Sequence, residues 1–203
     1  MNIIPQVHTA DVTYPFVEIG KKAWMLKNLE VTHFRNGDLI LEAKSDKEWK
    51  DAGKAMKAAW CYYKNESQYG EHYGKLYNWF AVADERGLAP EGWHVPSDEE
   101  WTKLTETLGG RAGLKLKSAH GWEGLFGLIG GNGDNSSQFF GLPAGYRVNY
   151  GGFNDVKKQC LWWSTNEDNQ QRAWYRYLNH SDTFFRSSVY HKTYGFSVRC
   201  LKD

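Results

Sequence analysis

The clearest local signal in the sequence is the stretch Pro96-Ser97-Asp98-Glu99-Glu100-Trp101. Here the Ser97 hydroxyl can accept a hydrogen bond from the backbone N–H of Glu100, while the Glu100 carboxylate reaches back to the Ser97 backbone, which makes a capping box. Apolar residues then recur at helical spacing as far as Leu108, where two glycines follow. The pattern predicts a helix over residues 98–108.

The residues before this helix predict three further elements. Residues 17–25 alternate on either side of a Gly-Lys turn and predict a hairpin. Residues 45–57 are polar, and they predict a short surface helix or loop around Trp49. A second helix is predicted over 73–83, because five residues share one face at helical spacing, namely Tyr73, Leu76, Tyr77, Phe80 and Ala81.

The chain changes character after about residue 111. Residues 120–137 are rich in glycine and predict no regular element. Short aromatic runs follow, several of them alternating, at 139–140, 146–148, 161–164, 173–178, 184–189 and 194–200. Short strands joined by long loops, with two helices before them, indicate an α+β fold.

Composition and charge narrow the class of protein. The 203 residues include 10 Trp, 12 Tyr and 10 Phe, so large rings can build a sizeable core. We expect an N-terminal arm over 1–16 and one domain over 17–203. The net charge of +1 argues against a nucleic-acid partner. No apolar run approaches the ~20 residues of a membrane span, so no membrane insertion is expected.

The N-terminus and the cysteines leave the cellular compartment open. Residues 1–16 lack the basic start, the long apolar middle and the cleavage site of a signal peptide. Cys61, Cys160 and Cys200 allow either one disulfide with a spare thiol or three reduced thiols.

Six ordered motifs resemble those of a known family. They are Trp24-Met25 followed by Lys27-Asn28-Leu29, YGKLYNW at 73–79, GLAPEGWHVP at 87–96, WWST at 162–165, AWYRYL at 173–178 and GFSVRC at 195–200. From about Val17 to the C-terminus, the chain is similar to the Fibrobacter succinogenes major paralogous domain family.

The resemblance implies a fold and a setting. The family is similar to the formylglycine-generating enzyme branch of the C-type lectin-like fold. We therefore expect this fold, with the two helices and the C-terminal set of short antiparallel strands that the sequence pattern predicts. Its members are mostly bacterial surface or secreted proteins, especially in Bacteroidetes. We therefore expect a cell-surface, secreted or phage-virion protein rather than a cytoplasmic one.

Some members of the family are variable proteins of diversity-generating retroelements, including phage-encoded ones. Adenine-directed mutagenesis rewrites their codons near the 3′ end of the gene, and the scaffold displays the altered side chains as a ligand-binding surface. Between 178 and 195 the family tends to be rich in Asn, whereas this chain carries Phe, Ser, Tyr, His, Asp and Thr. Asn codons readily become codons for these residues in adenine mutagenesis, although ordinary drift gives the same composition.

These observations predict non-catalytic recognition of a protein or glycan ligand on a cell surface. Aromatic and Arg side chains supply contact area, and Ser and His supply adaptable hydrogen bonds. Neighbouring Phe184 and Phe185 point to opposite faces of a strand, so at most one belongs to the core. The candidate ligand-binding residues are Trp163, Asn166, Tyr175, Tyr177, His180, Asp182, Phe184, Phe185, Arg186, Ser187, Ser188, Tyr190, His191 and Tyr194.

An alternative function is a structural or adhesin-like surface module of fixed specificity. An alternative structure for residues 184–191 is a core strand whose rings pack inward. Most of the aromatic residues in the WWST and AWYRYL motifs are expected in the core. Adjacent Trp162 and Trp163 are expected to divide between core and surface.

Calcium is a candidate cofactor, although the default expectation is none. Hard oxygen ligands occur in two groups, Asn132, Asp134, Asn135 and Ser136, and Asn166, Glu167 and Asp168. Neither group matches an EF-hand, and the Glu-Pro-Asn and Trp-Asn-Asp motifs of calcium-dependent lectins are absent from the sequence.

A formylglycine-type oxidase is the least favoured alternative. Such enzymes bind copper through a close cysteine pair near the end of the chain, whereas Cys160 lies far before Cys200. The resemblance leaves a Cys61–Cys200 disulfide open, because that fold brings its termini together. His94 lies in the GWHVP motif and is expected to form a hydrogen bond in a turn. No catalytic or metal-binding residue is assigned.

Overall fold

The computed structural model describes residues 14–124 and 131–203. Its elements in chain order are β1 (Phe16–Ile19), β2 (Lys22–Met25), β3 (Leu41–Glu42), α1 (Asp46–Lys54), β4 (Ala59–Cys61), the 3₁₀ helix η1 (Tyr63–Asn65), α2 (Ser67–Tyr73), β5 (Leu76–Tyr77), α3 (Trp79–Val82), β6 (Trp93–His94), α4 (Asp98–Leu108), α5 (Ala112–Leu116), β7 (Ala144–Arg147), β8 (Phe153–Val156), β9 (Gln159–Glu167), β10 (Arg172–Asn179), β11 (Phe185–His191) and β12 (Leu201–Lys202). Among these residues no helix is both long and apolar enough to cross a membrane.

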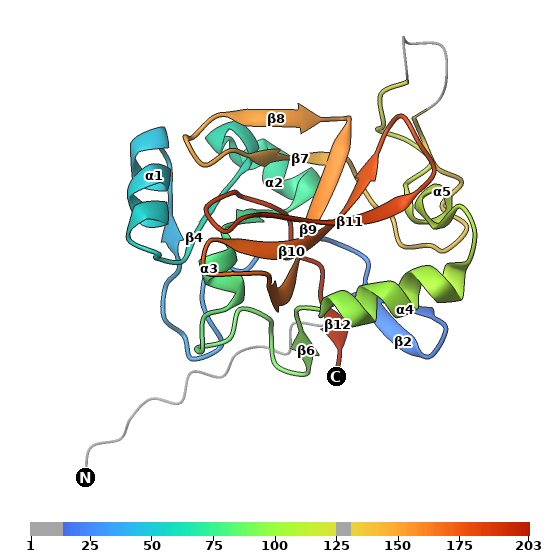
Figure 1. Ribbon diagram of the computed structural model, residues 1–203, viewed down its shortest axis with the longest axis horizontal. Helices are drawn as coiled ribbons and strands as arrows, with labels where there is room; N and C mark the ends of the chain where they lie inside the picture. Colours follow the sequence, from blue (N-terminus) through green and yellow to red (C-terminus); the bar gives the residue numbers. More distant parts are fainter. Residues whose placement is uncertain (1–13, 125–130) are drawn as a thin grey trace.

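Three sheets organise the chain (Figure 1). The largest has the strand order β11-β10-β9-β7-β8, with β9, β10 and β11 antiparallel and β7 parallel to β9. A four-stranded sheet of order β1-β2-β12-β6 joins the first hairpin to the last strand, and a small sheet joins β3, β4 and β5. The α+β class and the antiparallel C-terminal strands are confirmed, while the C-type lectin-like fold stays a prediction.

The capping box at Ser97 is confirmed. The Ser97 Oγ accepts from the backbone N–H of Glu100, and the Glu100 carboxylate accepts from the backbone N–H of Ser97, so α4 begins at Asp98. The helix ends before Gly109, whose φ of +69° breaks the helical geometry. Residues 98–108 are therefore the predicted helix.

The predicted helix over 73–83 is wrong. Gly74 has a φ of +77° and ends α2 at Tyr73. The chain then pairs with β4 as β5, and the Asn78 side chain accepts from the Ala81 N–H to begin the short helix α3. The apolar spacing instead reflects burial of Tyr73, Leu76 and Tyr77 in three different core clusters.

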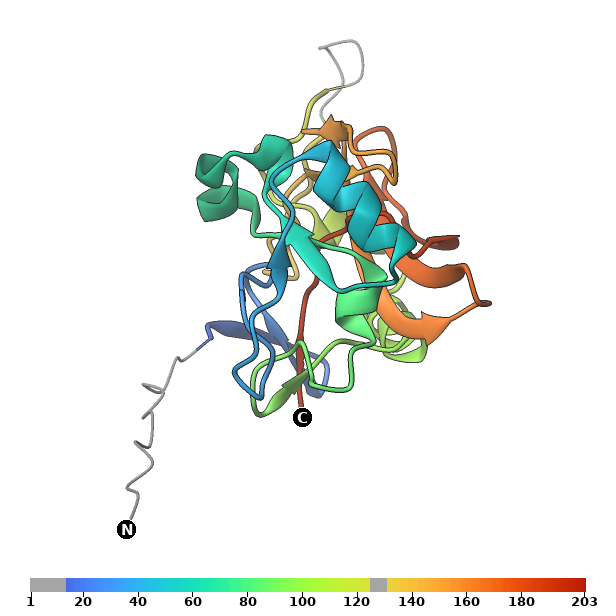
Figure 2. The ribbon, with the colours of Figure 1, turned by 90° about the vertical axis from the view of Figure 1, so that its left-hand side faces the viewer.

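The remaining local predictions are confirmed or made specific. The hairpin forms between β1 and β2, with a φ of +65° at Gly20 in the turn. Residues 45–57 contain the helix α1, capped by Ser45 and lying on the outside of the molecule (Figure 2). Trp49 lies on the inner face of this helix and is buried, and its indole N–H donates to the carbonyl of Thr193.

Strand β9 is covered on both faces. The Trp162 ring lies 6.2 Å from Trp101 of α4 and 5.8 Å from Phe139. The Trp163 ring lies on the opposite face and stacks on Phe196 at 4.2 Å. Both tryptophans are 0% exposed, so the expected division between core and surface is wrong. The sheet separates two clusters of buried residues instead.

A buried arginine joins distant segments at the centre of the fold. Arg199 is 1% exposed, and its Nη1 donates to the carbonyls of Met25 and Phe139, both at 2.8 Å. Its Nε and Nη2 donate to the Asn28 Oδ1, which also accepts from the Trp162 indole N–H at 2.8 Å. The Asn28 Nδ2 donates to the carbonyl of Tyr73 and to Ser197. This cluster ties the first hairpin, α2, β9 and residues 195–200, the closing segment, together.

We expect Asn28→Ala to destabilise the fold strongly. The substitution leaves three buried N–H donors of Arg199 and Trp162 without their common acceptor, and each such loss costs about 1–3 kcal/mol. Urea denaturation should therefore show a loss of more than about 3 kcal/mol in the free energy of unfolding. Asn149→Ala, at an exposed turn residue, is the matched control. A loss of under about 1 kcal/mol, the usual size for one ordinary hydrogen bond, would contradict the central role of Asn28.

A candidate recognition face on the central sheet

One face of β10 and β11 is turned away from α4. Directly opposed residues of antiparallel strands share a face, and the register pairs Tyr175 with Ser188, Tyr177 with Arg186 and Ala173 with Tyr190. The other face carries Arg176, whose guanidinium forms an ion pair with Asp98 of α4. The face away from α4 therefore groups the predicted tyrosines.

We call this surface the tyrosine face. It comprises Tyr146, Tyr175, Tyr177, Arg186, Ser188, Tyr190 and Tyr194. Tyr175 stacks on Tyr177 at 5.6 Å, and the edge of Tyr190 meets Tyr194 at 4.3 Å. Tyr190 is 37% exposed, whereas Tyr175 is buried at the centre. The outer rings are thus accessible but held by their neighbours.

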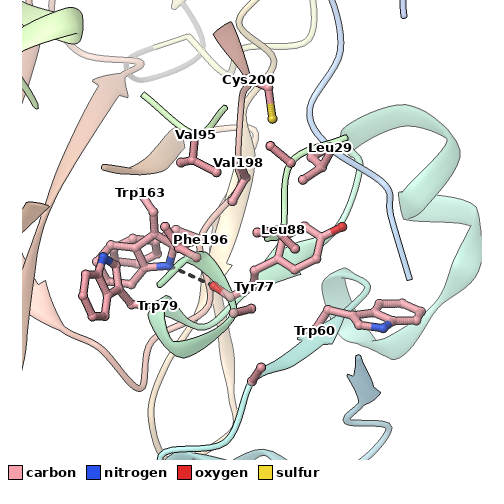
Figure 3. Packing of buried hydrophobic residues seen from close by; sticks show 14 of the residues in the cluster. Leu29, Trp60, Tyr77, Trp79, Leu88, Val95, Trp163, Phe196, Val198 and Cys200 are labelled. Carbon is pink, nitrogen blue, oxygen red and sulfur yellow. Dashed lines mark hydrogen bonds between the residues drawn. The ribbon is translucent and has the colours of Figure 1, made fainter. Parts of the chain in front are cut away.

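The tyrosine face rests on a rigid aromatic base. Phe196 is fully buried and lies 5.0 Å from Tyr175 and 4.2 Å from Trp163. The Trp163 indole N–H donates to the carbonyl of Tyr77 at 2.9 Å, as drawn in Figure 3. The Trp79 indole in the same cluster donates to the carbonyl of Ser164. These bonds fix the rings beneath the exposed tyrosines.

The hydroxyls of Tyr175 and Tyr194 on this face keep their protons at neutral pH. Burial raises the pKa of Tyr175 to about 12, although a hydrogen bond with Ser188 acts in the opposite direction. Burial and then a hydrogen bond with Tyr190 raise the pKa of Tyr194 well above its usual value. At neutral pH these hydroxyls can therefore both donate and accept hydrogen bonds.

Three predicted site residues, Trp163, Tyr175 and Phe185, are core residues. Trp163 is fully buried, and Phe185 is 7% exposed on the α4 side of the sheet, with ring centroids 5.6 Å from Trp101 and 6.1 Å from Trp162. The expectation that both could reach a ligand is corrected by the strand register, which turns them inward. Phe184 is 56% exposed, so the expectation that at most one of the two phenylalanines is core is confirmed.

The turn between β10 and β11 forms a second exposed group. The Arg186 guanidinium lies 4.8 Å above the Phe184 ring and donates to the Asp182 carboxylate at 3.1 Å. The other oxygen of Asp182 accepts from the backbone N–H of Phe184. His180 bonds through Nδ1 to the carbonyl of Glu123. Arg186 thus connects this turn to the tyrosine face.

The other predicted residues are spread around these groups. Ser187 is exposed on the face opposite Ser188, and His191 stacks on Tyr194. Asn166 lies apart, because its Oδ1 accepts from the backbone N–H of Asp98 at the start of α4. Its role in the structure is to cap that helix.

The sequence did not indicate that Tyr146 belongs to the tyrosine face or that Tyr150 is exposed. Tyr146 of β7 lies 6.4 Å from Tyr194 and 6.0 Å from Phe196, and Tyr150 is 64% exposed. The parallel pairing of β7 with β9 brings Tyr146 to the tyrosine face. The sequence shows Tyr146 in a short alternating run, but it does not show that this strand lies beside β9.

The candidate calcium ligands already accept hydrogen bonds. The side-chain oxygens of Asn132, Asp134 and Asn135 accept from the backbone N–H groups of Trp122, Ser136 and Phe140. In the other group, Glu167 pairs with Lys192 and Asp168 with Arg172. The described ranges hold no group of three or more His, Cys, Asp or Glu side chains placed for a metal ion. Calcium stays an untested prediction.

The three cysteines are reduced and lie in three different buried clusters. The Cys61–Cys200 disulfide that was left open is not formed. Burial raises the thiol pKa of Cys61 to about 11 and those of Cys160 and Cys200 to about 12. His94, expected in a turn, lies in β6 and bonds to Asp203 and Glu100.

We expect Phe185→Ala to destabilise the fold strongly rather than to alter recognition selectively. Removing a ring packed against Trp101 and Trp162 creates a cavity that costs about 3–5 kcal/mol. Urea denaturation checks this, and Phe184→Ala, at the neighbouring exposed ring, is the control and should cost under about 1 kcal/mol. Equal losses for the two variants would contradict the assigned faces.

The model of the Fibrobacter succinogenes major domain matches residues 17–202. No curated protein matches the chain, and no solved structure matches it. The match covers almost the whole chain and includes all three sheets. The chain therefore belongs to the Fibrobacter succinogenes major domain family.

Proposed function

We propose that the chain is a non-catalytic binding protein that recognises a protein or glycan ligand on a cell surface through the tyrosine face. The observation that carries the proposal is the arrangement of partly exposed tyrosines over a buried base of Trp163 and Phe196. Tyrosine supplies large contact area and a polar hydroxyl, and it has few rotatable bonds.

The packing of the rings lowers the entropy cost of binding. Tyr177 is held by its stack on Tyr175, and Tyr190 by its contacts with Tyr194 and Tyr175. Rings that are already ordered lose less freedom when a ligand arrives. Arg186 adds a positive charge at the edge of the face, and it can pair with an acidic group or stack on a ring.

The second part of the proposal is that a retroelement diversifies this binding surface. The segment 195–200 is buried throughout and supplies the base, while much of 180–191 is exposed. Exposed side chains of this segment can change without disturbing the packing beneath them. A buried base beneath an exposed segment supports the proposal that the surface varies on a fixed scaffold.

The alternatives are a structural or adhesin-like module of fixed specificity and a formylglycine-type oxidase. The first shares the cell-surface or virion setting that we propose, and it differs in having one unchanging partner. The second needs cysteine thiolates, which the burial of Cys160 and Cys200 disfavours. The binding face therefore remains the better-supported proposal.

We expect the double variant Tyr177→Ser, Tyr190→Ser to lose binding at least about tenfold, because each ring supplies contact area that a hydroxyl group alone does not replace. Wild type and variant would be compared on protein and glycan arrays, followed by titration of each hit. Leu39→Ser, at an exposed apolar residue before β3, is the control. Its binding should equal that of the wild type.

Thermal unfolding keeps this test specific. The double variant should melt within a few degrees of the wild type, because Tyr190 is exposed and Tyr177 is only partly buried. Unchanged binding to every array hit in a folded variant would overturn the tyrosine face as the recognition site.

Deep sequencing of codons 150–203 in a growing population tests diversification. We expect substitutions at template-adenine positions in exposed codons such as 184, 186 and 190, and none at buried codon 185 or across 195–200. The reason is that changes at buried positions unfold the scaffold. A uniform background would remove diversification and leave a domain of fixed specificity.

A further inference from the structure

A cavity of about 360 Å³ lies between residues 26–30, the end of α2 and the loop at 140–142. Buried residues, among them Asn28 and Arg199, belong to its lining, and exposed charged side chains stand around it. Its volume lies at the small end of the range for small-molecule sites. None of its lining residues belongs to the tyrosine face.

The guanidinium that lines this cavity has unused binding capacity. Arg199 has five N–H groups, and four of them donate to Asn28, Met25 and Phe139. Its fifth, on Nη2, has no acceptor within the described part of the chain, and no carboxylate there acts on the pKa of Arg199. A buried cation held only by neutral oxygens favours an anion beside it.

An exposed ring beside the cavity is held in a strained conformation. Phe140 has a φ of +54° and is 40% exposed, although bulky side chains rarely adopt the left-handed region. Its backbone N–H donates to the Asn135 Oδ1, and the carbonyl of preceding Phe139 accepts from Arg199. The same loop therefore positions the ring and the guanidinium. Strain of this kind clusters at ligand-binding sites.

We propose that this cavity binds a small carboxylic acid with an aromatic or branched apolar tail. The carboxylate would accept the remaining N–H of Arg199, and the tail would pack on Phe140 and Leu142. The exposed charged side chains among the lining residues are Lys27, Glu30 and Glu71, so they give the opening no net positive charge. Selection for an anion therefore comes from the buried guanidinium.

Phenylacetate is the probe, and phenylacetamide is its uncharged match. In ¹H–¹⁵N spectra of the ¹⁵N-labelled protein, phenylacetate should cause saturable shifts of the Gly74 and Phe140 amides and the Arg199 Nε–H. Phenylacetamide should bind at least about tenfold more weakly, because it brings no charge to the guanidinium. Equal binding of the two compounds would overturn the anion site, as would shifts located elsewhere or no saturable shift with phenylacetate.

Phe140→Gly separates recognition from folding. Glycine accepts the positive φ, so the variant should fold at least as well as the wild type. Loss of the ring should weaken phenylacetate binding about three- to tenfold. Unchanged affinity in this variant would overturn the role of the ring. Tyr190→Ser should leave phenylacetate binding unchanged, which keeps this test independent of the tyrosine face.

Discussion

The contact between Arg199 and Asn28 holds the architecture together. One amide oxygen accepts hydrogen bonds from Nε and Nη2 of the guanidinium and from the Trp162 indole, and Nη1 of the guanidinium donates to two backbone carbonyls. Because burial lowers the pKa of Arg199 only to about 10, the group stays charged at neutral pH. The closing segment is thereby fixed against the first hairpin and the central sheet.

This attachment gives the central sheet two different faces. On one face Trp162 and Phe185 pack toward α4. On the other, Phe196 of the closing segment lies under Trp163 and Tyr175 and supports the exposed tyrosines. An aromatic core is well suited to this task, since indole N–H groups bind carbonyls while the rings fill space. Side chains above this base can differ in chemistry while the backbone beneath them stays in place.

Local sequence signals predicted what depends on local chemistry. The capping box and the Gly-Lys turn require only neighbouring residues, so helix 98–108 and the first hairpin were predictable. The helix over 73–83 was not, because pairing of Leu76 with Cys61 competes with helical spacing. The burial of Trp163 and Phe185 likewise depends on strand order and register. Those are set by contacts between residues far apart in the sequence, and the same is true of the arrival of Tyr146 at the face.

Because the cysteines lie apart, each thiol can report on the opening of a different part of the core. Cys61, Cys160 and Cys200 each occupy a different buried cluster, and each is shielded from solvent. A thiol reagent can reach one of them only when its own cluster opens. Identical labelling rates would mean that the three clusters open as one cooperative unit. Different labelling rates would order the three clusters by how readily each one opens and would identify the cluster that opens most easily.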